Sequence, residues 1–131
     1  MPKPLPEPAK AWLDAKEFIT LATIEPDGWP QQTLVWVTRD GDDVLMSTVK
    51  GRRKHRNLER DARASALLFP TDSPYSYFEV RGTVTMTEAG GRELIDELHE
   101  KYHGSRPYPY DEPDDVRVVI RLAAEHVVFR G

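Results

Sequence analysis

Residues 47–58, with the sequence STVKGRRKHRNL, bring hydroxyl groups, a glycine and several cations together at one point of the chain. The pattern predicts that a strand leads into a helix here, so that Arg52, Arg53 and Lys54 lie in the first helical turn. Cations in that turn oppose the helix dipole and destabilise the helix by a few tenths of a kcal/mol each. A bound anion would remove this conflict, because it accepts hydrogen bonds from free N–H groups, hydroxyls and cations. The segment therefore predicts a phosphate-binding site, and the alternative is a solvated basic helix face.

The positive charge of the chain is concentrated in the same region. Between Lys50 and Arg63, seven basic residues stand against two acidic ones, which gives this stretch a net charge of +5 in a chain whose formal net charge is −4. The remainder is strongly acidic and would repel a long polyanion. The distribution favours a compact anionic ligand. A nucleic-acid module with a basic helix is the alternative, but the chain has no recognisable docking motif, so we expect no nucleic-acid partner.

Two other segments resemble metal sites in composition. Residues 99–103 match the H-E-x-x-H pattern, in which two histidines on one helix face bind zinc. Gly104 ends this helix, and a third ligand is not evident. The acidic run 111–115 lacks the spacing of a calcium loop. We therefore expect a surface helix followed by a solvated loop, and no metal site.

Two aromatic segments leave their roles open. Residues 32–36 alternate around Trp36 and carry amide and hydroxyl side chains, so this strand could lie against a planar heterocycle or form a half-buried part of a barrel. Tyr75, Tyr77 and Phe78 could belong to the core or form the wall of a pocket at a dimer interface.

The elements that must position these residues are mainly short strands. We predict strands at 18–25, 31–39, 44–48, 64–69, 75–87, 116–122 and 126–129, and helices at 9–16, 50–61 and 91–103. Three helices are too few to alternate with six or seven strands. The pattern therefore predicts a mainly β (α+β) fold in which an antiparallel sheet closes into a barrel.

Length and composition limit the possibilities further. The 131 residues, of which 39% are hydrophobic, predict a single domain spanning residues 1–131. The absence of cysteine excludes thiolate metal sites and cysteine nucleophiles. No apolar run reaches the roughly 20 residues that a membrane helix needs, and the first residues lack the apolar stretch of a signal peptide. We therefore expect a cytoplasmic protein without a membrane partner.

Taken together, these segments resemble the flavin and deazaflavin oxidoreductases of the pyridoxamine-5′-phosphate-oxidase-like split-barrel superfamily. The resemblance is greatest to the branch that uses the deazaflavin coenzyme F420. It covers almost the whole chain, and its most specific part is the run Lys50-Gly51-Arg52-Arg53-Lys54-x-Arg56-Asn57-Leu58. The other matching segments are 18–25, Asp27-Gly28-Trp29-Pro30, Val35-Trp36, Ser47-Thr48-Val49, Asp61, 77–82 and 116–120.

The resemblance implies a homodimer of split antiparallel barrels with two cofactor sites, each built from both subunits. Residues that would hold the cofactor phosphate and its anionic tail are Ser47, Thr48, Lys50, Arg52, Lys54 and Arg56. Residues that would lie beside the cofactor ring are Gln32, Thr33, Val35 and Trp36, while Tyr75 and Tyr77 would come from the partner subunit.

The same resemblance implies an oxidoreductase that transfers a hydride between reduced F420 and an unsaturated organic acceptor, such as a tetrapyrrole like biliverdin, a quinone or a lactone. F420 carries more negative charge than flavin mononucleotide (FMN), which agrees with the crowded cations. No catalytic acid, base or nucleophile is expected, because the cofactor supplies the chemistry. Two alternatives remain: an FMN-binding oxidase or reductase of the same fold, and a non-catalytic protein that binds F420 or a tetrapyrrole.

Overall fold

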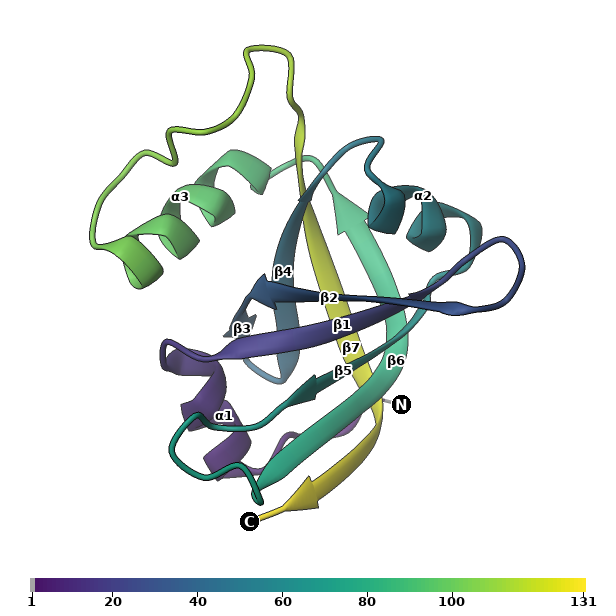
Figure 1. Ribbon diagram of the computed structural model, residues 1–131, viewed down its shortest axis with the longest axis vertical. Coiled ribbons are helices and arrows are strands. Elements are labelled where there is room, and N and C mark those ends of the chain that lie inside the picture. Colours follow the sequence, from purple (N-terminus) through teal and green to yellow (C-terminus); the bar gives the residue numbers. More distant parts are fainter. Residues whose placement is uncertain (1) are drawn as a thin grey trace.

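A computed structural model describes residues 2–131 of the chain as one curled antiparallel sheet with three helices (Figure 1). In chain order the elements are α1 (Glu7–Asp14), β1 (Phe18–Ile24), β2 (Pro30–Trp36), β3 (Thr38–Asp40), β4 (Asp43–Val49), α2 (Arg53–Arg60), β5 (Arg63–Leu68), β6 (Tyr77–Thr87), α3 (Gly91–His103) and β7 (Arg117–Arg130). This mainly β architecture confirms the predicted split antiparallel barrel with seven strands and three short helices.

The sheet has the strand order β2-β1-β5-β6-β7-β4-β3, and all neighbouring strands are antiparallel. The edge strands β2 and β3 are joined by Val37 alone, whose side chain is fully buried. The sheet therefore curls until its two edges approach each other (Figure 1). In this view α2 and α3 lie towards one end of the barrel and α1 lies towards the other.

The hydrophobic core fills the inside of the curled sheet. Its largest fully buried side chains are Phe78, Leu13, Ile19, Leu21, Met46, Leu68, Ile120 and Leu122. α1 contributes Ala9 and Leu13 to this core. α3 packs on the sheet through a second, smaller cluster formed by Leu94, Leu98 and Val119. The alternation of buried and more exposed residues along the strands produces this arrangement.

The C-terminal part of the chain differs from the prediction. Two short strands were expected between residues 116 and 129, but β7 is one strand of 14 residues. It pairs along the whole of β6 with a register shift between Arg81 and Gly82, where Arg81 lies opposite His126 and Gly82 opposite Ala124. The apparent interruption in the sequence is therefore a β-bulge within a continuous strand.

The predicted strand 31–39 and the predicted helix 50–61 also have different boundaries. Residues 31–39 divide into β2 and β3, because the chain turns at the buried Val37. α2 begins only at Arg53, since Gly51 has a left-handed backbone (φ +93°) and Arg52 is extended. Arg52 is thus the N-cap residue of α2, and Lys50 lies outside the helix.

Lys101 fastens α3 to the rest of the fold. Its ammonium group donates hydrogen bonds of 2.6 Å to the carbonyl oxygens of Leu13, in α1, and Val37, between β2 and β3. The neighbouring Tyr102 accepts a hydrogen bond from the Val37 N–H group (3.1 Å) and donates one to the Glu17 carbonyl. These bonds fix the C-terminal half of α3 against the corner of the sheet.

We expect Lys101→Met to lower the free energy of unfolding by about 1–3 kcal/mol, because two partly buried carbonyl groups lose their charged donor. Urea unfolding measures this loss. The control is Lys16→Met, which changes the same side chain at an exposed position. Equal stabilities of the two variants would show that Lys101 does not hold α3 in place.

Among residues 2–131, no helix combines the length and apolar character needed to cross a membrane.

Candidate functional site

A cleft of about 390 Å³ lies where α2, α3 and the β2 edge of the sheet come together. Its lining comes from β1, β2, β4, β7, both helices and the segment 104–116, which connects α3 to β7. The lining residues are Phe18, Leu34, Val35, Trp36, Ser47, Arg52, Lys54, Ile95, Leu98, Tyr108 and Arg117. The cleft therefore joins a group of cations to a group of aromatic and aliphatic side chains.

The cations Arg52 and Lys54 lie at the start of α2. Neither forms an ion pair or a side-chain hydrogen bond within residues 2–131, whereas Lys50 pairs with Glu88 (3.0 Å) and Arg53 with Glu25 (3.4 Å). Burial, followed by the nearby charges of Arg52 and Arg117, lowers the pKa of Lys54 below its usual value. The structure thus brings unpaired positive charge together at the helix N-terminus, which is an arrangement that favours a bound anion.

Hydrogen bonds as well as apolar packing hold α2 on the barrel. Asn57 is buried and donates to the Thr23 hydroxyl (3.0 Å) on β1, while Arg60 donates to Asn57 Oδ1 (3.0 Å) and to the Ile24 carbonyl. His55 is also buried and accepts a hydrogen bond from the Gly51 N–H group (3.1 Å). Leu58 is the one apolar residue of α2 that is buried in the core, and the buried polar side chains of His55 and Asn57 add to this anchor. Because α2 buries His55 and Asn57, its basic residues lie on the protein surface or in the cleft.

The two hydroxyl residues of β4 face in opposite directions, because successive side chains of a strand alternate. Ser47 lines the cleft. Thr48 is buried on the other face of β4 together with Val44 and Met46, and its hydroxyl has no hydrogen-bond partner among residues 2–131. The predicted anion site includes the hydroxyls of both Ser47 and Thr48, whereas the structure brings only Ser47 to the cleft.

The other end of the cleft is aromatic. The Trp36 ring stacks on Tyr102, with ring centroids 5.2 Å apart and an interplanar angle of 9°, and meets the edge of Tyr108 at 6.1 Å. Phe18 and Leu34 complete this end and are about half and 70% exposed, respectively. Trp36 is therefore fixed in orientation between α3 and the segment 104–116.

Several predicted site residues lie outside this cleft. Gln32 is exposed on β2, and Thr33 faces the other side of that strand, where its hydroxyl is buried without a partner among residues 2–131. Arg56 is exposed on α2. Tyr75 is 84% exposed in the loop before β6, and Tyr77 is half-buried at the start of that strand. Of the predicted residues, the structure brings Val35, Trp36, Ser47, Arg52 and Lys54 to the cleft.

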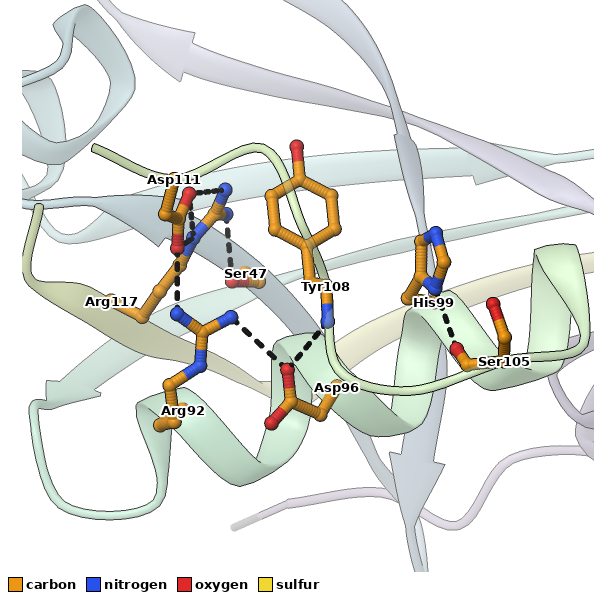
Figure 2. A network of polar contacts seen from close by, with 8 residues as sticks. All are labelled: Ser47, Arg92, Asp96, His99, Ser105, Tyr108, Asp111 and Arg117. Atoms are coloured by element: carbon orange, nitrogen blue, oxygen red, sulfur yellow. Dashed lines mark hydrogen bonds and ion pairs between the residues drawn. The ribbon is translucent and has the colours of Figure 1, made fainter. Parts of the chain in front are cut away.

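Arg117 and Tyr108 also line the cleft, although neither is among the predicted site residues. Arg117 is only 8% exposed, forms an ion pair with Asp111 (2.7 Å) and donates to the Ser47 hydroxyl (3.3 Å), as Figure 2 shows. The available signal was an arginine at the start of an apolar strand, a few residues after an acidic run. The expected solvated loop is thus wrong for Asp111, whose side chain is 7% exposed.

The H-E-x-x-H segment does not form a metal site. Among the described residues, no three histidine or acidic side chains come together in a geometry that could hold a metal ion. His99 is buried rather than on the surface, and its Nδ1–H group donates to the Ser105 carbonyl oxygen (2.6 Å), which fixes the turn after α3 (Figure 2). The motif therefore has a structural role here.

A second cavity, of about 460 Å³, surrounds the bulge in the sheet. Its arginines are already paired, because Arg63 contacts Asp61 (2.7 Å) and Arg81 contacts Glu79 (3.2 Å). Unlike the cleft at α2, this cavity offers an anion no unpaired arginine among the described residues.

Comparison with known proteins agrees with this fold. A family model described as pyridoxamine 5′-phosphate oxidase matches residues 5–131. Among solved structures, an F420 reductase is 28% identical, with a TM-score of 0.82 and coverage of 95% of this chain and 98% of that chain. A conserved hypothetical protein from Mycobacterium tuberculosis is 27% identical, with a TM-score of 0.77 and coverage of 94% and 82%.

More distant structures share the fold. One is a pyridoxamine 5′-phosphate oxidase-related, FMN binding protein from Nostoc punctiforme, which is 17% identical, has a TM-score of 0.62 and covers 84% of this chain and 72% of that chain. The family match extends over nearly all the residues described here and includes every strand of the barrel and every residue of the cleft. The chain therefore belongs to the pyridoxamine 5′-phosphate oxidase family, a family of oxidoreductases with the split-barrel fold.

Proposed function

We propose that this chain is an F420-dependent oxidoreductase that transfers a hydride between reduced F420 and an unsaturated organic acceptor. The observation that carries the proposal is the cleft itself, in which the unpaired Arg52 and Lys54 lie at one end and Trp36 at the other. F420 has the matching chemistry, since it joins an anionic phosphodiester and glutamate tail to a planar ring. The likeness to an F420 reductase over 95% of the chain supports the same conclusion.

The residues of the cationic end suit a phosphate group. Lys54 is partly withdrawn from water near two other cations, so its charge is poorly compensated in the free protein. A phosphate oxygen would supply the missing negative charge, and hydrogen bonds between charged groups contribute about 1.5–3 kcal/mol each. The Ser47 hydroxyl accepts from Arg117 and keeps its own proton for donation to such an oxygen.

The residues of the aromatic end would bind and orient the ring and the acceptor. When bound, the deazaflavin supplies the hydride-transfer chemistry. Trp36 is held by its stacking on Tyr102, so it offers a surface of fixed orientation. Phe18, Leu34 and Leu98 would exclude water from the reacting groups. We assign no catalytic acid or base to the chain, because its part is to bind, orient and desolvate.

The proposal includes a homodimer in which a second copy completes the site. Leu34, Leu67 and Val128 lie in one cross-strand row on the outer face of the sheet, where they alternate with Thr20 and Glu79, and they are 70%, 43% and 36% exposed. Apolar groups that gather on a surface in this way mark interaction sites. Because Leu34 also lines the cleft, a second copy on this face would reach the cofactor, and Tyr75 and Tyr77 are the residues it would contribute.

The dimer is tested by sedimentation equilibrium. We expect the wild type to sediment at twice its mass of 15.0 kDa, and Leu67→Asp to sediment as a monomer, because a charge on this face would be desolvated in the dimer. Thr85→Asp, at another exposed strand position, is the control. A monomeric wild type would contradict the shared site.

The catalytic proposal is tested by mixing reduced F420 with the protein and a panel of tetrapyrroles, quinones and lactones, and following the return of oxidised F420. We expect at least one acceptor class to be reduced at a rate that depends on the protein concentration. Tight binding of F420 without turnover of any acceptor would instead favour a protein that stores or delivers the cofactor.

The affinity for F420 is predicted to fall at alkaline pH. The pKa of Lys54 is lowered in the free protein, and a bound phosphate would raise it, so binding takes up a proton between the two pKa values. The affinity is therefore constant at low pH and decreases as the pH rises through the pKa of the free protein. Titrations from about pH 7 to about pH 10 measure this decrease, and Lys54→Arg should remove it because arginine remains charged. A wild-type affinity independent of pH would contradict the role of Lys54.

A further inference from the structure

The segment 104–116, between α3 and β7, is fastened by a network of ion pairs (Figure 2). Arg117 holds Asp111 in a two-pronged contact, with Nε at 2.9 Å from Oδ2 and an Nη2–Oδ1 distance of 2.7 Å. Arg92 on α3 contacts both Asp111 (3.1 Å) and Asp96 (3.0 Å). The segment is therefore tied to β7 at one point and to α3 at another.

The central pair of this network is buried. The side chains of Arg117 and Asp111 are 6% and 7% exposed, and hydrogen bonding from Arg117 lowers the pKa of Asp111. Removing one partner of a buried ion pair leaves an uncompensated charge and is strongly destabilising. The network thus gives the segment one preferred position, and separating Asp111 from Arg117 should release it.

The same network places Tyr108 in the wall of the cleft. The Tyr108 N–H group donates to Asp96 Oδ1 (2.9 Å), and the guanidinium of Arg117 lies 4.8 Å from the centre of the Tyr108 ring. The Tyr108 ring also lies nearly perpendicular to the rings of Trp36 and His99, at 6.1 and 5.7 Å between ring centroids. Tyr108 is thereby held between an arginine and the aromatic end of the cleft.

Arg117 also reaches the cleft directly, through its hydrogen bond to Ser47 (3.3 Å). Arg52 and Lys54, in contrast, lie at the start of α2 and share no hydrogen bond or ion pair with the network among residues 2–131, although the charge of Arg117 lies near Lys54. The cleft therefore has two distinct groups of lining residues, the cations at the start of α2 and the residues held by the Arg117 network. The start of α2 presents cations to the cleft, while the network contacts Tyr108 in its aromatic wall.

We propose that Arg117 is a positioning residue that, through Asp111, holds Tyr108 against Trp36 and so limits which organic acceptors enter the aromatic end of the cleft. The part that concerns acceptors rests on the proposed function. The part that concerns the position of Tyr108 does not, because it can be measured in the protein without any ligand.

The first test uses the ligand-free protein. In Asp111→Asn we expect amide hydrogen exchange of Tyr108 and its neighbours to accelerate by about tenfold or more, while β5 and β6 keep their wild-type protection. Acrylamide should also quench Trp36 more strongly in this variant, in a Trp29→Phe background that removes the exposed tryptophan. The control is Asp114→Asn, which makes the same change of charge at an exposed position of the same segment.

A second variant keeps the test decisive if Asp111→Asn fails to fold. Arg92→Gln removes only the outer, half-exposed ion pairs, so exchange of the segment and quenching of Trp36 should rise by smaller factors in the same direction. Exchange and quenching equal to those of Asp114→Asn in every one of these variants that folds would overturn the proposal.

The second test compares a small and a bulky quinone as acceptors of reduced F420. We expect Asp111→Asn to lower KM for the bulky quinone relative to the small one, and not to weaken F420 binding. An unchanged preference in a variant whose segment is demonstrably looser would show that the network is structural only. If no variant binds F420, the proposed function fails, but the exchange and quenching results still decide whether Arg117 positions Tyr108.

Discussion

Replacing Arg52 and Lys54 together by alanine is expected to weaken F420 binding by about tenfold or more, because each can form charge-assisted hydrogen bonds worth about 1.5–3 kcal/mol. Both side chains line the cleft, and neither is engaged by a carboxylate within residues 2–131. Their removal therefore costs the ligand its partners and leaves no protein group unpaired. Isothermal titration calorimetry of the wild type and the double variant measures the difference.

The control for this experiment must lose the same charge from outside the cleft. Arg53→Ala combined with Lys16→Ala does so, because Arg53 points to Glu25 and Lys16 lies exposed beyond α1. We expect this control to bind F420 nearly as well as the wild type. Equal affinities of the two double variants would show that overall charge attracts the ligand and that the start of α2 is not its binding site.

Gly82→Ala is expected to lower the free energy of unfolding by about 3 kcal/mol or more, which is the largest effect on stability that we predict. A Cβ atom at this position would lie 1.8 Å from the Ala123 carbonyl oxygen and 3.0 Å from its carbon, both of which belong to the backbone. Backbone atoms cannot rotate away as a side chain would, so β6 and β7 would have to separate at the bulge. Urea unfolding followed by circular dichroism measures the loss.

Thr85→Ala tests whether the effect belongs to Gly82 or to β6 in general. Thr85 is exposed on the same strand, and we expect its replacement to change the stability only slightly. A Gly82→Ala variant as stable as Thr85→Ala would contradict the description of this glycine as a close-approach position. Loss of the bulge would also disturb the register in which β6 pairs with the first half of β7, the strand that begins at Arg117.

The barrel and the gathering of cations at the start of α2 could be predicted because they depend on local patterns. Alternating apolar residues and tight turns indicated most of the strands, since one face of each strand must be buried. The cations of residues 52–54 conflicted with the dipole of their own helix, and this conflict pointed to an anion. The structure confirms the barrel and brings Arg52 and Lys54 to one cleft with Trp36.

The parts that were missed depend on contacts between distant residues. The sequence shows no reason for Asn57 to be buried until Thr23 is placed beside it, 34 positions away. Ser47 and Thr48 are adjacent, and only their directions on β4 separate the cleft from the interior. Arg117 and Asp111 are close in sequence, but their importance comes from burial, which the acidic composition of the loop had obscured.

We propose that the cleft between α2 and α3 binds F420 in preference to other ring-containing cofactors. The most direct measurement is a side-by-side titration of the purified protein with F420 and with FMN, which follows the quenching of tryptophan fluorescence at low and at moderate salt. Of the three tryptophans only Trp36 lines the cleft, so a ligand bound there should quench this residue most strongly. We predict micromolar or tighter binding of F420 with much weaker binding of FMN. The reverse preference would assign the protein to flavin chemistry, and binding of neither would contradict the account of the cleft.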